Sequence, residues 1–227
     1  MTPTLAFDVY GTLIDTAGVI DKLKDHVLDQ AAAFSALWRE KQLEYSFRRG
    51  LMQNYREFSV CTRQALDYAC RVFDTDIPRS DRDALMEVYR VLPPFPEVKE
   101  ALETLRSGDA RMFAFSNGTA DAVRGLLRNA GIDGFFDDVV STDEIRSFKP
   151  NPAVYAHFLR RAGASGSEAW LISSNPFDVI GAISAGMRAA WVKRSPRAVF
   201  DPWEIQPTLT IGGLGELHDA LQRIRSV

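Results

Sequence analysis

Four short segments carry side chains that could act together on a substrate. They are Asp8–Thr12, Ser116–Asn117, Lys149–Pro150 and Ser173–Asp178. Together they supply two carboxylates, an ammonium group, hydroxyls and amides. A carboxylate can serve as a nucleophile or as a base, and an ammonium group can offset its charge. These residue types are those of a catalytic site.

Taken singly, each of these residues has an ordinary structural explanation. Asp8 could cap a helix, "SNG" at 116–118 could be a turn, and Asp178 could favour the positive end of a helix dipole. Lys149, which precedes a proline, could be a solvated surface residue. Their order along the chain favours the catalytic interpretation, because all four segments stand where predicted strands end.

Short apolar strands alternate with helices through most of the chain. Strands are predicted at Thr4–Val9, Arg111–Phe115, within 137–145, at 169–174 and at 188–193, and helices at Pro96–Arg106, Ala120–Asn129, Pro152–Ala162 and Phe177–Ala185. This alternation is typical of βαβ units. We therefore expect an α/β fold with a Rossmann-like parallel sheet, in which ligands bind at the carboxyl ends of the strands.

A helical insert interrupts this sheet after its first strand. Residues 31–58 are rich in helix-forming residues and lack proline, and residues 63–73 and 82–92 also have helical character. The segment "VLPPFPEV" then breaks the pattern with three prolines. We expect residues 1–15 and 93–227 to form a catalytic core, and residues 16–92 to form a helical cap above its active edge.

Composition and charge argue against several classes of protein. The formal charge is −3 at pH 7 and the basic residues form no patch interleaved with aromatics, so we expect no nucleic-acid partner. No apolar stretch approaches the ~18 residues of a membrane span. No signal peptide is visible either, so we expect a cytoplasmic protein with no membrane partner. Cys61 and Cys70 are then expected to be reduced thiols.

In their order, the four segments resemble the motifs of the haloacid dehalogenase superfamily. The first motif is a nucleophilic Asp, here Asp8, with Thr12 four residues later. Ser116 and Lys149 match the second and third motifs, and the loop that ends at Asp178 matches the fourth. The resemblance covers essentially the whole chain, including the helical insert, which looks like the first type of cap in that superfamily.

Tyr10 sets this chain apart from most members of the superfamily, which are phosphatases. They carry a second Asp there, which exchanges protons with the leaving alcohol and with water. A phenol, with a pKa of about 10, is a poor substitute. The fourth motif reads "SSNPFD", with serines and Asn175 where the extra carboxylate of a Mg²⁺ site would be expected. A halide leaves without a proton. The absence of a second Asp at position 10 and of the extra carboxylate in the fourth motif therefore both fit dehalogenation without a metal or other cofactor.

The resemblance narrows to the L-2-haloacid dehalogenases, which the segments "FDVYGTL", "LWREKQLEYS", "KPNPAVY" and "SSNPFD" match. It implies hydrolysis of small (S)-2-haloalkanoic acids to (R)-2-hydroxy acids and halide, by a homodimer whose substrate is a small 2-halocarboxylate. Glu40 stands where Gln is common and Phe177 where Trp is common. These two departures leave the substrate range and the leaving-group preference open.

The same resemblance implies a role for each residue of the site. Asp8 would form a covalent ester, Lys149 would keep it ionised and Thr12 would orient it. Residues expected to position and activate the hydrolytic water are Ser173, Asn175 and Asp178, and those expected to bind substrate or halide are Tyr10, Arg39, Leu43, Phe58, Ser116, Asn117, Tyr155 and Phe177. Without the resemblance, Leu43 and Phe58 would more often be core residues.

Two other functions stay open at this point. One is a Mg²⁺-dependent phosphatase or phosphonate hydrolase on the same fold, whose activity would vanish with a chelator. The other is a non-catalytic binding module, which would have no need of the intact Asp8, Lys149 and Asp178.

Overall fold

A parallel sheet forms the centre of the computed structural model, which describes residues 3–108 and 110–225. Its described strands lie in the order β3-β2-β1-β4-β5-β6. They are β1 (Thr4–Phe7), β2 (Arg111–Ser116), β3 (Asp138–Ser141), β4 (Ala169–Ser173), β5 (Arg188–Val192) and β6 (Leu209–Ile211). The prediction of an α/β fold with a parallel sheet is confirmed. The three-residue edge strand β6 was not predicted, because it is too short for a hydrophobic period to show.

Both faces of the sheet are buried, and successive residues of β1 alternate between them. Leu5 and Phe7 belong to one apolar cluster and Ala6 to another. Side chains in a strand point to opposite faces in turn, and a parallel sheet has helices on both sides. This is why the strands read as continuous apolar runs in the sequence.

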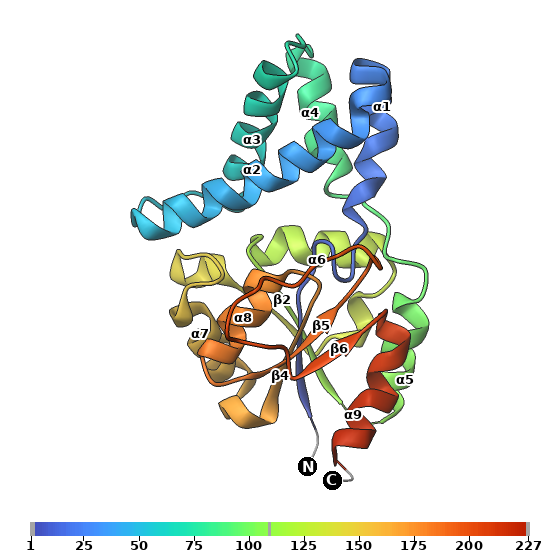
Figure 1. Cartoon of the computed structure of the whole chain (residues 1–227), viewed down its shortest axis with the longest axis vertical. Coiled ribbons are helices and arrows are strands. Elements are labelled where there is room, and N and C mark those ends of the chain that lie inside the picture. Colours follow the sequence, from blue (N-terminus) through green and yellow to red (C-terminus); the bar gives the residue numbers. More distant parts are fainter. Residues whose placement is uncertain (1–2, 109, 226–227) are drawn as a thin grey trace.

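Helices that follow the strands cover these two faces (Figure 1). Side chains of α7 (Pro152–Ala162) and α8 (Pro176–Ser184) join the Ala6 cluster. Side chains of α5 (Val98–Ser107), α6 (Ala120–Asn129) and α9 (Leu217–Arg225) join the Leu5 cluster. The strands are thereby fixed in register, and their carboxyl ends meet at one edge.

Further helices are inserted between β1 and α5, and Figure 1 shows them above the carboxyl edge of the sheet. They are α1 (Ile20–Val27), α2 (Ala31–Leu51), α3 (Phe58–Val72) and α4 (Arg79–Val88). Helix α2 ends seven residues before the predicted end at residue 58. The chain turns there, with Gln53 at a φ of +53°, so that the apolar face of α3, which begins at Phe58, can pack on α2.

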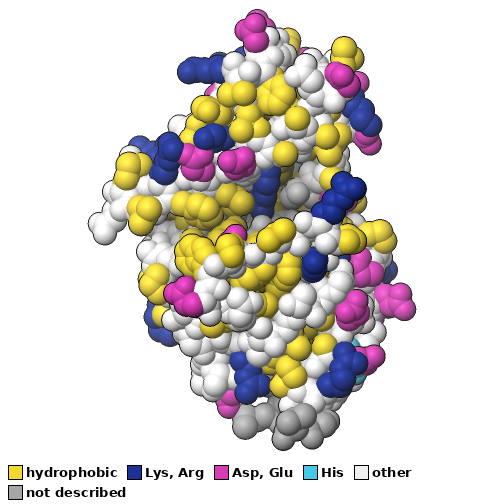
Figure 2. Space-filling view, in the orientation of Figure 1, with side chains coloured by type: hydrophobic (Ala, Val, Ile, Leu, Met, Phe, Trp, Pro, Cys, Tyr) yellow, Lys and Arg dark blue, Asp and Glu magenta, His cyan; other side chains and the backbone are white. Residues whose placement is uncertain are grey.

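Two antiparallel connections join the inserted helices to the sheet. Ile14 and Pro94 form a bridge, Asp15 N–H donates to Pro93 O at 2.9 Å, and Phe95 N–H donates to Leu13 O at 3.0 Å. The Leu5 cluster also continues into the inserted helices. Figure 2 shows hydrophobic side chains on both sides of the hollow between the two parts.

No helix within residues 3–108 and 110–225 is both long enough and apolar enough to cross a membrane.

Candidate active site

Asp8 follows the end of β1 in a tight loop that folds back on its side chain. Its N–H donates to Ile172 O of β4 at 3.0 Å. Gly11 has a φ of +84°, a left-handed value that favours glycine, and this turn brings Thr12 back toward Asp8. The Thr12 hydroxyl donates to Asp8 Oδ2 at 2.9 Å. The loop thus delivers the carboxylate and its first hydrogen-bond donor together.

Three donors hold the Asp8 carboxylate, which is largely buried. Oδ2 accepts from Thr12 and also from Asn175 Nδ2 at 2.8 Å, whereas Oδ1 accepts from Lys149 Nζ at 3.2 Å. A carboxylate has roughly four lone-pair sites for hydrogen bonds, two on each oxygen. Oδ1 therefore keeps a lone pair, and it is the oxygen better able to attack an electrophile.

Lys149 is 1% exposed and sits between two carboxylates. Its Nζ donates to Asp8 Oδ1, to Phe115 O at 2.9 Å and to Asp178 Oδ2 at 2.8 Å, which uses all three of its hydrogens. Burial alone would lower the pKa of Lys149, but the charges of Asp178 and Asp8 outweigh it and raise the pKa. Lys149 is therefore an ammonium ion at neutral pH.

Asp178 lies in the first turn of α8 and is fully buried. Lys149 holds Oδ2, and the Tyr155 hydroxyl donates to Oδ1 at 2.8 Å. Burial raises the pKa of Asp178, and the neighbouring Asp8 charge adds to this, against the opposing attraction of Lys149. Burial and Asp178 also raise the pKa of Tyr155, so its phenol stays protonated. A carboxyl group with a raised pKa is a better proton acceptor than an exposed one.

Ser116, Asn117 and Ser173 lie at the ends of β2 and β4, around Asp8. The Asn117 side-chain oxygen accepts from Lys149 N–H at 2.9 Å and from Thr142 Oγ1 at 3.2 Å. Ser116 Oγ accepts from Gly118 N–H, and Ser173 Oγ accepts from Asn175 N–H. These bonds shape the loops, and the hydroxyl hydrogens of the two serines are not used in them.

Arg39 reaches down from α2 to the Asp8 loop. Its Nη2 donates to Tyr10 O at 3.2 Å, and its Nη1 donates to Gln42 Oε1 at 2.7 Å. The guanidinium therefore spans the junction between the inserted helices and the sheet. Arg39, which lies outside the four sequence motifs, is thus brought to the loop that carries Asp8.

Aromatic and aliphatic side chains close the space around this loop. Phe58 has its ring centroid 6.3 Å from that of Tyr10, and Leu43 packs against the cluster that contains Phe58. Phe177, at the start of α8, has its ring centroid 4.9 Å from that of Phe47 on α2. Phe177 therefore forms part of the contact between the inserted helices and the core.

A cavity of about 270 Å³ is lined in part by the Tyr10 side chain. Its walls include Tyr10, Gln42, Phe58, Tyr89 and Gly118, which come from the core and from the inserted helices. Desolvation by burial raises the pKa of Tyr10 to about 12, although Arg39 opposes the shift. Tyr10 is therefore a neutral wall residue near pH 7, with little capacity to exchange protons there.

Hydrogen-bond donors already contact Asp8 Oδ2 and Tyr10 O, two oxygens that a hard cation would need as ligands. Asn175 Nδ2 donates to Asp8 Oδ2 and lies 3.5 Å from Tyr10 O, and Arg39 donates to the same Tyr10 O. Mg²⁺ needs oxygen ligands with free lone pairs, so these contacts do not fit it. Within the described residues, no group of three or more His, Cys, Asp or Glu side chains is placed to hold a metal ion.

Ser174 and Gly181 also support the site, although neither was among the predicted residues. Ser174 N–H donates to the Thr12 hydroxyl oxygen at 2.9 Å, and this oxygen lies closer to its acceptor Asp8 Oδ2, at 2.9 Å, than to Ser174 Oγ, at 3.2 Å. A Cβ at Gly181 would lie 2.5 Å from the Tyr155 hydroxyl oxygen, so only glycine admits Tyr155 to Asp178. Ser174 lies inside the fourth motif, whereas no signal in the sequence marks Gly181.

Arg194, just beyond β5, contacts the end of the Asp8–Thr12 loop. Its guanidinium donates to Thr12 O, pairs with Glu97 and lies 3.8 Å from the centroid of the Phe95 ring. It therefore joins the loop to the segment through which the chain returns from the inserted helices. Its basic neighbour Lys193 is the only local hint in the sequence, and a pair of basic residues does not indicate such a role.

Comparison with known proteins agrees with this geometry. The sequence model of the haloacid dehalogenase-like hydrolase family matches residues 2–186. An (S)-2-haloacid dehalogenase 2 from Pseudomonas sp. (strain CBS-3) is 37% identical over 217 residues, which are 96% of this chain and 94% of that protein. Haloacetate dehalogenase H-2 from Moraxella sp. (strain B) is 37% identical over 207 residues, 91% of this chain and 92% of that protein. The chain belongs to the haloacid dehalogenase-like hydrolase family.

Solved structures share the whole fold. The L-2-haloacid dehalogenase from Xanthobacter autotrophicus has a TM-score of 0.90 and 30% sequence identity, and the match covers 98% of this chain and 99% of that one. A structure of the Xanthobacter enzyme with chloropropionic acid covalently bound has a TM-score of 0.89 with the same identity and coverage. Within the family, the chain is thus similar to dehalogenases over nearly its full length.

Proposed function

We propose that the protein is a dehalogenase that hydrolyses small (S)-2-haloalkanoic acids to (R)-2-hydroxy acids and halide. The observation that carries this proposal is the hydrogen bonding of the Asp8 carboxylate. Two donors fill Oδ2, while Oδ1 keeps a lone pair beside the Lys149 ammonium group. Position 10 holds Tyr10 and not a second carboxyl group that could protonate a leaving group, which favours a leaving group that needs no proton. The relatives that act on 2-haloacids support the same choice.

In the first half of the reaction, Asp8 Oδ1 attacks Cα of the substrate from the side opposite the halogen. The new C–O bond forms as the C–halogen bond breaks, and the halide leaves with the bonding electron pair. Attack in line with the leaving group inverts Cα, so an (S) substrate gives an (R) product. Lys149 offsets the negative charges of nucleophile and substrate, which otherwise repel each other. The structure of a related enzyme with a covalently bound chloropropionic acid supports an ester intermediate.

Groups around Asp8 would hold the two ends of the substrate. The Ser116 hydroxyl and nearby backbone N–H groups suit the substrate carboxylate. Arg39, Asn117 and Phe58 suit the halide, because a guanidinium donates without deprotonating and a ring edge carries partial positive charge. The side chains expected to form apolar walls around Cα are Tyr10, Leu43 and Phe177.

In the second half, water attacks the carbonyl carbon of the Asp8 ester. Asp178 accepts the proton of this water, which its raised pKa favours. Asn175 and Ser173 position the water near the ester, and Tyr155 holds Asp178 in place through its hydroxyl. The ester bond between the carbonyl carbon and the product oxygen then breaks, and the departing alkoxide takes back the proton held by Asp178. The product alcohol leaves with the oxygen that came from Asp8, the second proton of the water is released to solvent, and the carboxylate of Asp8 is restored.

Halide release tests this function directly. The protein should release chloride from chloroacetate and from L-2-chloropropionate, but not from the D enantiomer, and the rate should be unchanged in excess EDTA. Chirality of the 2-hydroxypropionate formed, measured by chiral chromatography, should be D. A phosphatase would hydrolyse p-nitrophenyl phosphate and would lose that activity in EDTA. Loss of chloride release on chelation, with recovery on adding Mg²⁺, would contradict the proposal.

The same proposal assigns a role to each of the two parts of the chain. Residues 1–15 and 93–227 form the catalytic core, and residues 16–92 form a cap that supplies Arg39, Leu43 and Phe58 to the site. The pairing of Asp15 with Pro93 supports a boundary at these points, because the chain leaves and re-enters the core side by side. We also place the protein in the cytoplasm, where both free cysteines remain thiols.

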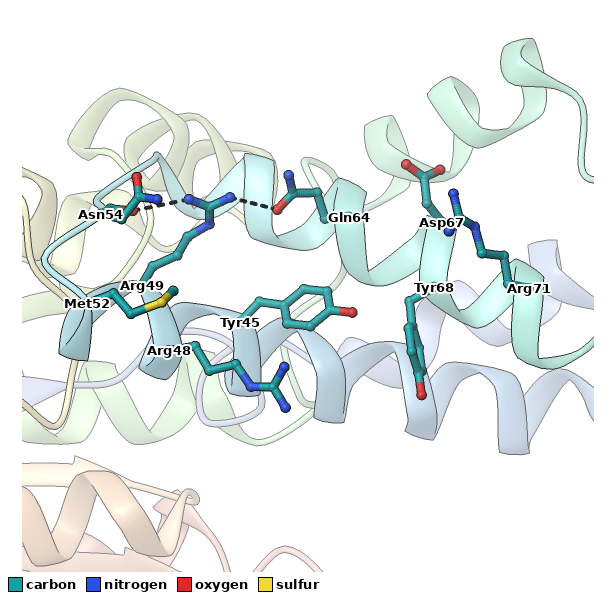
Figure 3. A pocket seen from close by; sticks show the side chains of 9 residues that line it. All are labelled: Tyr45, Arg48, Arg49, Met52, Asn54, Gln64, Asp67, Tyr68 and Arg71. Atoms are coloured by element: carbon teal, nitrogen blue, oxygen red, sulfur yellow. Dashed lines mark hydrogen bonds between the residues drawn. The ribbon is translucent and has the colours of Figure 1, made fainter.

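A homodimer through the cap completes the proposal. Helices α2 and α3 enclose a groove of about 410 Å³ lined by Tyr45, Arg48, Met52, Tyr68 and other side chains (Figure 3). Apolar side chains nearby are exposed, with Leu51 at 87% and Met52 at 64%. Such a patch fits a self-complementary interface between two copies. Sedimentation should give twice the 25.4 kDa chain mass, and Met52→Glu should shift it toward the monomer. A monomeric wild-type protein at micromolar concentration would contradict this.

A further inference from the structure

Three polar side chains of the cap form a hydrogen-bonded relay that ends at Arg39. Arg39 Nη1 donates to Gln42 Oε1 at 2.7 Å, and Gln42 Nε2 donates to Thr62 Oγ1 at 2.6 Å. Gln42 is 2% exposed and Thr62 is 4% exposed. Buried polar groups are costly unless they are paired, so each member of this relay depends on the next.

The hydrogen bond that Thr62 donates determines which group is donor and which is acceptor along the relay. The Thr62 hydroxyl donates its single hydrogen to Phe58 O at 3.0 Å, one turn earlier in α3. Thr62 Oγ1 can then only accept, so the Gln42 amide must turn its nitrogen to Thr62 and its oxygen to Arg39. Gln42 lies three residues after Arg39 on α2, which places the two side chains on one face of that helix.

The other end of the guanidinium is held by the core. Arg39 Nη2 donates to the carbonyl of Tyr10, two residues beyond the nucleophile Asp8. Two contacts from different directions fix both the position and the plane of the guanidinium, which a single contact would leave free to rotate. We infer that Gln42 and Thr62 are positioning residues, which aim the Arg39 guanidinium at the departing halide. This inference rests on the function proposed above.

The chemistry of the leaving group gives this role a distinct signature. Negative charge gathers on the halogen as its bond to carbon breaks, so a well-aimed donor stabilises the transition state more than the bound substrate. Misalignment of Arg39 should therefore lower kcat with little effect on KM. Chloride is a poorer leaving group than bromide, so chloroacetate should depend on the donor more than bromoacetate does.

The substitution Gln42→Met tests the relay, because methionine has similar length and lacks both polar groups. We expect kcat for chloroacetate to fall about 10-fold or more, since small misplacements at a reacting centre cost up to ~10²-fold. The loss for bromoacetate should be smaller. Thr62→Val should show the same pattern in weaker form. Thr62→Ser keeps the hydroxyl and should restore kcat to near the wild-type value.

A matched control lies in the same cap. Asp21 Oδ1 accepts from Lys24 Nζ at 2.7 Å, a hydrogen-bonded pair three residues apart on α1, and both side chains are exposed. Lys24→Met should leave both rates unchanged. In a double-mutant cycle, Gln42→Met should add no further loss to Arg39→Lys, because the Lys variant has already lost the planar fork that Gln42 aims.

The outcomes separate this inference from the proposed function. If the wild-type protein releases halide but Gln42→Met matches it, the positioning role is wrong. The role is also wrong if Gln42→Met slows both substrates equally, or adds its full loss to that of Arg39→Lys, because either result indicates general damage to the cap. A wild-type protein that releases no halide from any 2-halo acid would instead overturn the proposed function.

Discussion

A single turnover in H₂¹⁸O should place the heavy oxygen in the carboxylate of Asp8 and leave the 2-hydroxy acid unlabelled. The reason is that water attacks the ester carbonyl on Asp8, while the oxygen bound to Cα comes from Asp8 itself. Enzyme in excess over substrate limits the reaction to one turnover. Mass spectrometry of the product and of the N-terminal peptide then measures where the label lies.

The structure provides an internal control for this experiment. Asp178 is proposed to accept a proton from the same water and never to form an ester, so the peptide that carries Asp178 should remain unlabelled. Many turnovers should bring label into the product, because Asp8 then transfers oxygen gained in earlier cycles. Label in the product during the first turnover would show that water attacks Cα directly, and Asp8 would then be a base and not the nucleophile.

The substitution Lys149→Met should have a comparably large effect, on both rate and stability. It leaves the Asp8 and Asp178 carboxylates buried without their shared cation. Halide release should fall on the order of 10³-fold or more, because the charge that balances nucleophile and substrate is gone. The free energy of unfolding at neutral pH should drop by about 3–5 kcal/mol, the usual effect of removing one partner from a buried ion pair. Urea denaturation measures this loss, and Lys99→Met, at an exposed site on α5, is the matched control.

The loss of stability should depend on pH in a definite direction. Burial and the neighbouring carboxylate already raise the pKa of Asp178, and removing Lys149 removes the opposing attraction. The folded variant then binds a proton that the unfolded chain has released, so its stability falls as pH rises above the ordinary Asp range near 3.9. The difference from the wild type should therefore be smaller at pH 5 than at pH 8. An equal difference at both values would show that losing Lys149 does not change the pKa of Asp178.

Much of the site could be placed from the sequence, because parallel strands end at one edge. Once strands are predicted at Thr4–Val9, within 137–145 and at 169–174, the loops at their carboxyl ends must lie at one edge of the sheet. Asp8, Lys149 and Asp178 do meet, within hydrogen-bonding distance of a shared ammonium group. The α/β fold followed from the same strand and helix periods.

Partners of individual atoms could not be predicted in the same way. Asn117 was expected in the halide cradle, and its side-chain oxygen also fixes the backbone of Lys149. Gln42 reads as an ordinary polar residue of a helix until the packing of α3 on α2 buries it beside Thr62. Such pairings depend on the angles at which helices pack, and the hydrophobic periodicity of the sequence does not predict these angles. The early end of α2 has the same origin, since tertiary packing of α3 overrides local helix propensity.

The Asn175 amide, which faces both Asp8 Oδ2 and Tyr10 O, constrains how this chain could have diverged from phosphatases. A Tyr10→Asp change alone would bring a third carboxylate to a site that has only the Lys149 ammonium group to balance the charge. We expect this variant to bind no metal, because the Asn175 amide still donates to the oxygens that would coordinate the cation. Loss of the Asn175 amide alone would free a ligand oxygen while position 10 still lacked an acid. We expect both single variants to be inactive toward phosphate esters and impaired toward 2-halo acids. We therefore expect that a change from the proposed chemistry to phosphate-ester hydrolysis would need at least both substitutions together.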